Sequence, residues 1–471
     1  MAVFCVIATV KADVQSKKWS EVATKMTDSW YGTDEAKTVA ENVLLYQKNS
    51  GGWGKNIEMH KTLSEIERQS VIQAKSEKSC FDNSATTMEM RFLAKVYKHI
   101  GDARYYNAFN KALNCIINAQ YAGGGWPQYY PLRGGYSDYI TFNDNLMVNI
   151  LELMWDIYTA EDEFASIADY DSNIKIRAKT CYDKGLQCIL DCQIEDNGKK
   201  SVWCAQHDPY TLDPAEGRPH EHPSYSGSEG AKVLDFLMTI ENPSNEVKHA
   251  VISAAEWFMA HHLADKKVVD VKSEGRTVDR QIVDAPGERL WGRFMQLAGE
   301  TGARVYAAMI NKKKSDRRNV YSVDGKLYRY YSSDHIQDSY DPEREYAFLY
   351  GIYDSNRQQL YHRFLYNYDD TAPVIDENNV QIETSLGADN RRSYQYVGNW
   401  PNKVVYTAFP KWKTKHGITD GMEQIKAGSV NEDRKIYTLI GVKLADEVTV
   451  ETLQQLPLGI YIVNGKKYVV K

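Results

Sequence analysis

Apolar residues recur three and four positions apart through residues 18–264, a spacing that gathers them on one face of a helix. Within 83–100, for example, Met88, Phe92 and Val96 are each four residues apart. This periodicity predicts a mostly α-helical protein. The predicted helices are 35–48, 63–76, 83–100, 103–120, 144–160, 173–193, 227–241 and 245–263.

Three loops between these helices share a motif of glutamine, glycine and tryptophan. Gln47, Gln120 and Gln193 are each 73 residues apart, and each begins a loop that contains glycine and one tryptophan. The tryptophans of these loops are Trp53, Trp126 and Trp203. The constant spacing indicates a threefold internal repeat of helical hairpins. Paired helices in a cyclic threefold array would form an irregular α/α toroid with the aromatic loops gathered at one mouth.

The pattern changes after Glu288, where apolar and polar residues begin to alternate. Residues 320–330 surround an Asp-Gly pair at 324–325, and residues 460–470 surround an Asn-Gly pair at 464–465. These pairs favour the tight turns that join two antiparallel strands. The sequence therefore predicts two β-hairpins, the second of them within a small C-terminal β module.

Two further segments complete the expected organisation. Residues 338–365 return to a helical period, and residues 404–409 have the composition of a strand. Residues 366–428 are otherwise polar and lack a helical pattern. We therefore expect four parts: a signal-peptide remnant at 1–12, the toroid at 13–365, a polar, partly β connection at 366–428 and a β module at 429–471.

The N-terminus carries a short apolar run, Ala2 to Val10, that is too short to span a bilayer. It is typical of the apolar part of a signal peptide, with cleavage after Ala12, although a buried first strand is the alternative. No other run is long enough for a transmembrane helix. The sequence therefore predicts a secreted or cell-surface protein.

Charge and cysteine content narrow the choice of partner. The net charge of −6 argues against nucleic acid. Cys181, Cys188 and Cys192 share one helix face, and no histidine is placed among them at a zinc-binding spacing. We expect them to be buried small apolar residues and assign no disulfide.

Acidic and amide side chains begin two of the predicted helices. Asp82 and Asn83 precede one, and Asp144 and Asn145 precede the helix at the matching place in the next repeat. Such residues usually cap helices. Here a toroid would bring both pairs to one mouth, and carboxylate with amide oxygens is a ligand set that suits Ca²⁺. The sequence thus leaves two interpretations, helix caps alone or a calcium site.

Basic residues surround the same loops. A lone arginine is usually a solvated surface charge, but arginine beside aromatic loops can clamp a carboxylate with two hydrogen bonds. Tryptophan and tyrosine rings suit the faces of sugars. An acidic polysaccharide would match all of these features. The basic residues concerned are Lys55, Arg218, Arg289, Arg293 and Arg304.

Eight ordered motifs carry a resemblance to a known family. They are Gly51–Asn56, Asp82–Thr87, Gly125–Pro131, Thr141–Met147, Trp203–Pro209, Ser226–Glu229, Trp291–Phe294 and Glu343–Gly351. At these residues the chain resembles the calcium-dependent pectate lyases of polysaccharide lyase family ten. The resemblance implies an irregular α/α toroid that cleaves polygalacturonate (pectate) by β-elimination between C5 and C4 of galacturonate.

The resemblance also implies roles for individual residues. Asp82, Asn83 and Asp144 stand where the family places calcium and substrate ligands, and Arg218 and Arg293 stand where it binds substrate. We add three residues from the aromatic loops and their surroundings to the predicted site. The predicted substrate-binding residues are Lys55, Trp53, Trp126, Arg218 and Asp82; the predicted metal ligands are Asp82, Asn83 and Asp144; Arg293 is predicted to act in catalysis.

The chain departs from the family at the catalytic base. The family has an arginine in a segment like Ile-Phe-Ser-x-Arg-Asp-Gly, whereas here Val323 stands near that position, after an inserted segment at about 299–317. Arg318 is our choice of replacement, with Arg304 and Arg317 as alternatives. The base could also be absent, which would make the protein a weakly active or non-catalytic polygalacturonate-binding relative.

Two further expectations remain. The segment 458–471 resembles the type IX secretion sorting domain, which implies the type IX secretion machinery as a partner, while an ordinary β appendage is the alternative. An inverting glycoside hydrolase on a toroid is a third possible function, because Glu221, Glu229 and Asp208 supply carboxylates for such chemistry.

Overall fold

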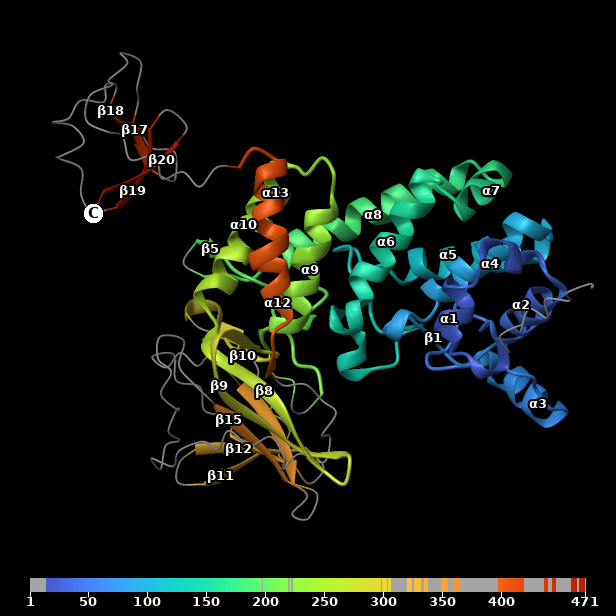
Figure 1. Ribbon diagram of the computed structural model, residues 1–471, viewed down its shortest axis with the longest axis horizontal. Coiled ribbons are helices and arrows are strands. Elements are labelled where there is room, and N and C mark those ends of the chain that lie inside the picture. Colours follow the sequence, from blue (N-terminus) through green and yellow to red (C-terminus); the bar gives the residue numbers. More distant parts are fainter. Residues whose placement is uncertain are drawn as a thin grey trace, which may run out of the picture. The chain divides into compact units, whose positions relative to one another are not determined.

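The computed structural model describes residues 14–196, 198–218, 221, 223–297, 299–302, 304–305 and 397–418, and the backbone of strands within 320–364 and 436–470. The chain divides into two compact units, Met1–Tyr406 and Thr407–Lys471. The first unit carries most of the helices, which Figure 1 shows in blue to green. The predicted signal segment at 1–12 lies outside the described residues.

Helices form the framework of the first unit, as the sequence predicts. All eight helices predicted within residues 18–264 are confirmed, while α1 and the short α7 were not predicted. The helices are α1 (Trp19–Thr24), α2 (Asp34–Tyr46), α3 (Glu65–Gln73), α4 (Thr87–Ile100), α5 (Ala103–Ala119), α6 (Leu146–Thr159), α7 (Glu163–Tyr170), α8 (Asn173–Asp191), α9 (Gly227–Thr239) and α10 (Asn245–Ala260). Short 3₁₀ turns are η1 (Val14–Ser16), η2 (Asp28–Gly32), η3 (Ala74–Ser76), η4 (Asp82–Ser84), η5 (Gly135–Asp138) and η6 (Asn143–Asn145).

Side-chain caps set where several helices begin. The Asp102 side chain accepts a hydrogen bond from the backbone of Arg104 at the start of α5, and Ser244 accepts one from Val247 at the start of α10. Each cap satisfies a backbone N–H that has no partner within the helix. Gly101 ends α4 in the left-handed conformation, at φ 72°, which costs glycine little.

The glutamine at each repeat makes the same pair of hydrogen bonds. Each side-chain amide donates to a carbonyl within its own loop and to a carbonyl of a following helix. The pairs of acceptors are Gly51 and Ala108 for Gln47, Gly124 and Cys181 for Gln120, and Ser201 and Ala250 for Gln193. The local architecture therefore recurs three times, while closure of the repeats into a toroid stays a prediction.

The loop tryptophans also recur as one structural element. Their side chains are fully buried, and each indole N–H donates to a backbone carbonyl of the preceding helix. Trp291 repeats the arrangement a fourth time. The acceptors are Val43 for Trp53, Ile116 for Trp126, Ile189 for Trp203 and Phe258 for Trp291, at 2.7–3.0 Å.

Short antiparallel strand pairs join each loop to a segment far along the chain. The pairs are β1 (Ser79–Cys80) with β2 (Tyr129–Tyr130), β3 (Ile140–Thr141) with β6 (Gln206–His207), and β7 (Ser224–Tyr225) with β10 (Met295–Gln296). A further small pair is β4 (Glu195–Asp196) with β5 (Lys199–Lys200). One residue, Phe81, separates β1 from the η4 turn, and one residue, Phe142, separates β3 from η6, so the strand pairs fix where these turns lie.

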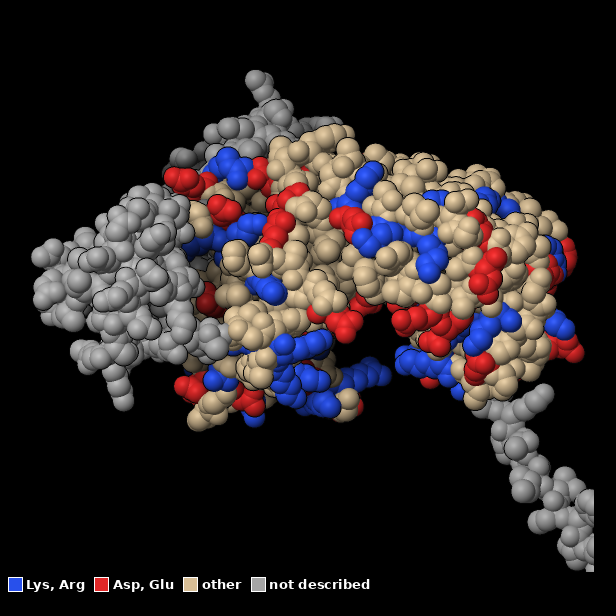
Figure 2. All heavy atoms as spheres, turned by 90° about the horizontal axis from the view of Figure 1, so that it is seen from above, with Lys and Arg blue, Asp and Glu red and all other residues tan. Residues whose placement is uncertain are grey.

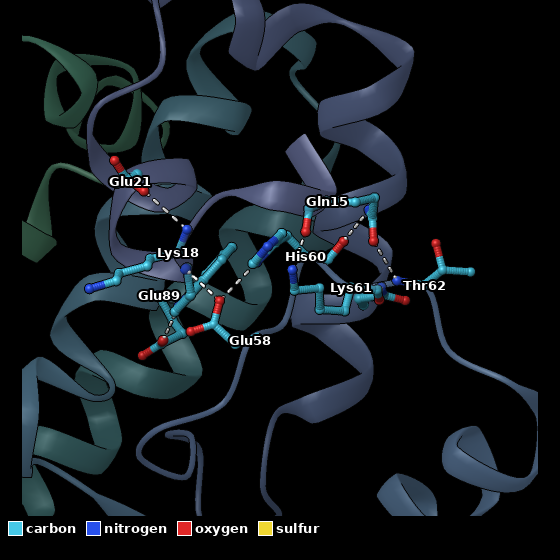
Figure 3. A network of polar contacts seen from close by, with 10 residues as sticks. Gln15, Lys18, Glu21, Glu58, His60, Lys61, Thr62 and Glu89 are labelled. Atoms are coloured by element: carbon cyan, nitrogen blue, oxygen red, sulfur yellow. Dashed lines mark hydrogen bonds and ion pairs between the residues drawn. The ribbon is translucent and has the colours of Figure 1, made fainter. Parts of the chain in front are cut away.

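The N-terminal segment is fastened to the loop before α3 (Figure 3). The Gln15 side chain donates to the His60 carbonyl at 2.8 Å and accepts from the Thr62 backbone at 3.1 Å. The Trp19 indole donates to the buried carboxylate of Glu89 at 2.7 Å. Because Glu89 lies in the first turn of α4, the segment is tied to the helix that follows the η4 turn.

A long hairpin follows α10 and was not predicted. The strand β8 (Leu263–Ser273) pairs with β9 (Arg276–Gly292), and β16 (Val397–Gly398) pairs with the end of β9. Charged residues are spread along both strands. They mask the alternation of apolar and polar positions that marks a half-buried strand.

Two predictions for the later part of the chain are wrong. The predicted helix 338–365 contains the antiparallel strands β14 (Leu349–Asp354) and β15 (Gln359–Phe364). The predicted strand 404–409 is helical, because α12 (Trp400–Lys403), a π-helical segment (Val404–Ala408) and α13 (Phe409–Lys415) follow one another. Local β-branched composition therefore did not decide the backbone conformation here.

Both predicted hairpins are confirmed. The strands β11 (Val320–Val323) and β12 (Lys326–Tyr331) are joined across 324–325, and β13 (Asp334–Gln337) pairs with β12. In the second unit, β19 (Gly459–Val463) and β20 (Lys466–Val470) are joined across 464–465. They belong to a four-stranded sheet with β17 (Ile436–Thr438) and β18 (Lys443–Ala445), in the order β18-β17-β19-β20.

Two expectations from composition can also be compared with the structure. The thiols of Cys181, Cys188 and Cys192 are free and buried, as predicted. Among the helices that the structure describes, none has both the length and the apolar content needed to cross a membrane.

Candidate active site

Two neighbouring turns, η4 and η6, carry the predicted metal ligands. Asn83 has φ 54° in the first, and Asp144 has φ 52° in the second. Asparagine and aspartate adopt this left-handed conformation more readily than other residues that have a Cβ atom. The two turns therefore have the same backbone shape, with Asp82 at the place of Asn143 and Asn83 at the place of Asp144.

Backbone hydrogen bonds hold the phenylalanine that precedes each turn. The Phe81 N–H donates to the Gln128 carbonyl, and the Phe142 N–H donates to the Ala205 carbonyl. Both phenyl rings are buried. Each turn is thus fixed by the loop of the following repeat, which is how residues distant in sequence come together.

The Asp82 carboxylate is buried and forms an ion pair with Lys55. Burial alone would lower the pKa of Lys55, but the hydrogen bond to Asp82 and its charge outweigh this effect and raise the pKa. Lys55 is therefore a cation in this site. Asn83 directly follows Asp82 in the chain. Its side-chain N–H donates to the side-chain oxygen of Asn56 at 3.3 Å.

The Asp144 carboxyl lies in a turn that packs against η4, which carries Asp82, and against α9, which carries Glu229 in its first turn. Burial raises the pKa of Asp144 to about 6, and the hydrogen bond with Asp82 and the charges of Asp82 and Glu229 act in the same direction. The guanidinium of Arg293 opposes them. The packing of η4 and α9 on η6, with the ion pair between Arg293 and Glu229, places Asp82, Asp144 and Arg293 in one region of the structure.

Arg293 forms an ion pair with Glu229, and both side chains are largely buried. The Ser226 hydroxyl donates to the other oxygen of the same carboxylate, at 2.5 Å. From the sequence, Glu229 is expected only as the end of the Ser226–Glu229 motif and as one of the carboxylates available to a hydrolase. Its role beside Arg293 was missed, because an ion pair across 64 positions has no local sequence signal.

Arg218 is held by Glu221, which is buried. The Arg218 Nε and Nη2 donate to Glu221 Oε1 at 2.9 and 2.7 Å, and the Arg218 backbone donates to Oε2 at 2.9 Å. The assignment of Arg218 to substrate binding stays a prediction. Asp208 caps its own turn by accepting from the backbone of Tyr210 and Thr211.

The assignment of Trp53 and Trp126 to substrate binding is wrong. Both rings are fully buried and hydrogen-bonded to the core, so neither presents a face to a sugar. Tyr129, in the second aromatic loop, is half-buried instead, and its phenol interacts electrostatically with Lys55. The aromatic sequence of this loop signalled a ring at the site, but it could not show which ring.

The remaining basic candidates lie in different surroundings. Arg304 is half exposed and forms an ion pair with Asp213. The Arg289 guanidinium lies over the Tyr406 ring, 4.2 Å from its centroid. Arg317 and Arg318 lie outside the described residues, and only the backbone of Val323 is described, within β11. The choice of Arg318 as the base therefore stays a prediction.

The charge of the site fits a hard divalent cation. Lys55 and Arg293 supply two positive charges against the three carboxylates of Asp82, Asp144 and Glu229. Burial is the largest cause of the raised pKa of Asp144, and the charge of Asp82 adds to it; a cation between the two carboxylates would offset both effects. In the described part of the chain no three His, Cys, Asp or Glu side chains form a ready-made metal cluster, so other ligands would come from amides, water or substrate.

The surface around the described elements carries both signs of charge. Figure 2 shows lysine and arginine interspersed with aspartate and glutamate, and basic side chains gathered at the lower edge of the described surface in that view. Such a mixture leaves recognition to local groups rather than to one uniform field.

Comparisons with known proteins place this site in a family. The sequence profile of the pectic acid lyase family matches residues 47–334, which is more than half of the chain. A family 10 polysaccharide lyase from Cellvibrio cellulosa matches the structure with a TM-score of 0.55 and 27% identity, over 85% of this chain and 95% of that chain. A mutant family 10 polysaccharide lyase from Cellvibrio cellulosa, in complex with trigalacturonic acid, gives a TM-score of 0.54 and 28% identity, over 83% of this chain and 95% of that chain.

No curated protein sequence matched the chain. The family profile covers the Gly-Trp loops, both aspartate turns and the Arg293 segment that form the site. The two structural matches extend the likeness over most of the chain. The chain therefore belongs to the pectic acid lyase family and is a polysaccharide lyase.

Proposed function

We propose that this protein is a calcium-dependent pectate lyase that cleaves polygalacturonate by β-elimination. The single observation that supports this best is the shared site of Asp82 and Asp144 beside Lys55 and Arg293. Paired carboxylates suit calcium, and cations beside them suit the uronates of the polymer. The trigalacturonic acid in the complex of the family 10 lyase supports the same class of ligand.

In this proposal the side chains of the site have separate roles in metal binding and substrate binding. Asp82 and Asp144, with the amide oxygen of Asn83, would hold calcium, which stabilises negative charge on the uronate when bound. Arg293 and Lys55 would bind and orient uronate carboxylates through charged hydrogen bonds. Tyr129 would offer a ring edge or face to a sugar.

The reaction would proceed without water. A base removes the proton from C5, which lies next to the uronate carboxyl, and the electron pair forms a double bond between C4 and C5. The C4–O bond breaks, and the departing oxygen takes up a proton. The protein contributes by stabilising the charge that builds on the carboxylate as the C5 proton leaves.

We also propose that the recurring loops close into an α/α toroid. This closure would gather their outer residues at one mouth.

The cellular destination is a separate part of the proposal. The N-terminal segment and the C-terminal β module would direct the protein to the cell surface or medium through type IX secretion. Detection of the intact, folded protein in the medium of a secreting host would support this destination, and its retention inside cells would contradict it.

A non-catalytic binding protein is the second candidate, because Val323 stands where the family has its basic residue. Incubation with polygalacturonate and calcium distinguishes the two. Formation of unsaturated uronides supports the lyase, whereas binding without product over a broad pH range supports the binding protein. Reducing ends without unsaturation, unaffected by chelator, would indicate a glycoside hydrolase; the ion pairs of Glu221 and Glu229 with arginine disfavour that role.

A further inference from the structure

Glu229 forms an ion pair with Arg293 near the Asp82–Asp144 carboxylates, but Glu229 itself has no part in the chemistry described above. Glu229 is 4% exposed, so its charge is shielded from water. A buried carboxylate is costly unless it is paired and hydrogen-bonded. The two partners of the buried Glu229 carboxylate, Ser226 and Arg293, therefore indicate what this residue does in the site.

Each oxygen of Glu229 has a different partner. Oε2 accepts from the Ser226 hydroxyl at 2.5 Å, while Oε1 pairs with Arg293 Nη2. Ser226 in turn accepts from the Glu229 backbone at 3.1 Å, which caps α9. Because the serine fixes one oxygen, the other oxygen is held in one place for the arginine.

The backbone on the arginine side is fixed by the same elements. The strand β7 ends directly before Ser226 and pairs with β10, which begins two residues after Arg293. Gly227 lies so close to Gly292 that an added Cβ atom would collide with the Gly292 carbonyl. The segment before α9 and the segment around Arg293 therefore act as one rigid unit.

Without Glu229, the carboxylates of Asp82 and Asp144 would still attract Arg293. The charge of Arg293 already acts on Asp144 in the structure. An arginine released from Glu229 would be drawn to Asp144 and Asp82, where it would compete with a cation and with substrate. The ion pair with Glu229 keeps the Arg293 guanidinium near these carboxylates but prevents it from forming an ion pair with them.

We propose that Glu229 is a positioning residue: anchored by Ser226, it holds the Arg293 guanidinium at the edge of the Asp82–Asp144 site, facing bound uronate. This inference rests on the proposed function. It adds that polyuronate recognition depends on a carboxylate that never touches the polymer.

The test is a double-mutant cycle with Glu229→Gln and Arg293→Ala. The Gln substitution keeps the shape and the Ser226 contact but removes the charge that holds the arginine. We expect it to weaken trigalacturonate binding, measured by calorimetry with calcium present, by about 10- to 100-fold. In the Arg293→Ala background the same substitution should change binding less than about threefold, since its effect passes through the arginine.

Two controls separate positioning from folding. Asp156→Asn removes a carboxylate that also pairs with an arginine, Arg91, but about 15 Å along α6 from the η6 turn. It should leave binding unchanged. Glu229→Asp keeps the charge and should recover part of the lost affinity; if Glu229→Gln does not fold, this variant carries the comparison, with a loss that again disappears in Arg293→Ala.

The outcomes separate this inference from the proposed function. Wild-type binding and cleavage with no effect of Glu229→Gln would overturn the positioning role alone. Equal losses in the wild-type and Arg293→Ala backgrounds would also overturn it, because they indicate a general structural defect. Binding without cleavage would overturn the proposed lyase function, while the double-mutant cycle would still measure the role of Glu229. Absence of both binding and cleavage would overturn the proposed function and the positioning role together.

Discussion

The carboxyl groups of Asp82 and Asp144 interact although they come from different turns of different repeats, because the η4 turn packs against the η6 turn. Two carboxyls can approach in this way only if one takes up a proton or a cation lies nearby. Lys55 pairs with the first and Arg293 acts on the second, yet the pKa of Asp144 is still raised to about 6. Burial is the main cause of this shift, and the site holds three carboxylates against two cations, which leaves a demand for positive charge.

The first prediction concerns this demand. Asp144→Asn should lower calcium-dependent lyase activity by about 100-fold or more, because a ligand and a charge at the reacting centre are lost. Its thermal midpoint should not fall, since the substitution also removes repulsion from Asp82. Kinetic assays and calorimetric melting of the same preparations measure both. Unchanged activity and unchanged calcium dependence would remove Asp144 from the site.

The second prediction separates two aromatic residues of one loop. Trp126→Ala should destabilise the protein by about 3–5 kcal/mol, because it empties a fully buried position and leaves the Ile116 carbonyl without its donor. Tyr129→Ala should instead raise the KM for polygalacturonate by about 3- to 10-fold with little loss of stability. Urea unfolding and steady-state kinetics provide the comparison. A stable Trp126→Ala variant with a raised KM would restore the tryptophan to substrate binding.

The third prediction tests whether the recurring glutamines are equivalent. Replacement of Gln47, Gln120 or Gln193 by leucine removes two hydrogen bonds to carbonyls and should cost about 1–3 kcal/mol in each case. Gln187→Leu, on an exposed side chain of α8, is the matched control and should cost less than about 0.5 kcal/mol. Chemical denaturation gives the free energies. A loss confined to one of the three glutamines would argue against equivalent repeats.

The fourth prediction concerns pH and the buried Glu89. Burial raises the pKa of Glu89 to about 7, against 4.5 for the free side chain, although Trp19 and the Thr86 backbone donate to it. The folded state therefore holds a proton that the unfolded state releases between these values. Its stabilising contribution is complete below about pH 4.5 and is lost as the pH rises through 7.

Glu89→Gln provides the measurement of this effect. The variant has no proton to lose, so the stability of the wild type relative to it should fall by about 3 kcal/mol across that window. Unfolding free energies of both proteins, measured at several pH values, give the difference. A constant difference would mean that Glu89 is ionised throughout and held by its two donors.

The helices and the two aspartate turns were readable from the sequence for physical reasons. Helices such as α4 and α6 have apolar stripes at a clear period, and their Asp and Asn starts carry their own signal. The equal spacing of the glutamines marked the repeat before any contact was known. These properties are local or periodic, so they can be read from the sequence without knowledge of tertiary contacts.

The remaining features depend on tertiary contacts. A tryptophan that donates to a core carbonyl and one that stacks on a sugar look alike in sequence, which is why Trp53 and Trp126 were misplaced. The ion pair of Glu229 and Arg293 depends on the pairing of β7 with β10, which no local sequence pattern predicts. The hairpin of β8 and β9 was missed because charged residues on both strands resemble a solvated helix or loop.

One assay decides the main proposal. Purified protein is incubated with polygalacturonate and calcium, and absorbance of the new C4=C5 double bond is followed beside a chelated sample and the Asp144→Asn variant. We predict a rise with calcium that is abolished by the chelator and nearly abolished by the substitution. No rise in the calcium sample, or an equal rise in all three, would contradict a calcium-dependent elimination at the Asp82–Asp144 site.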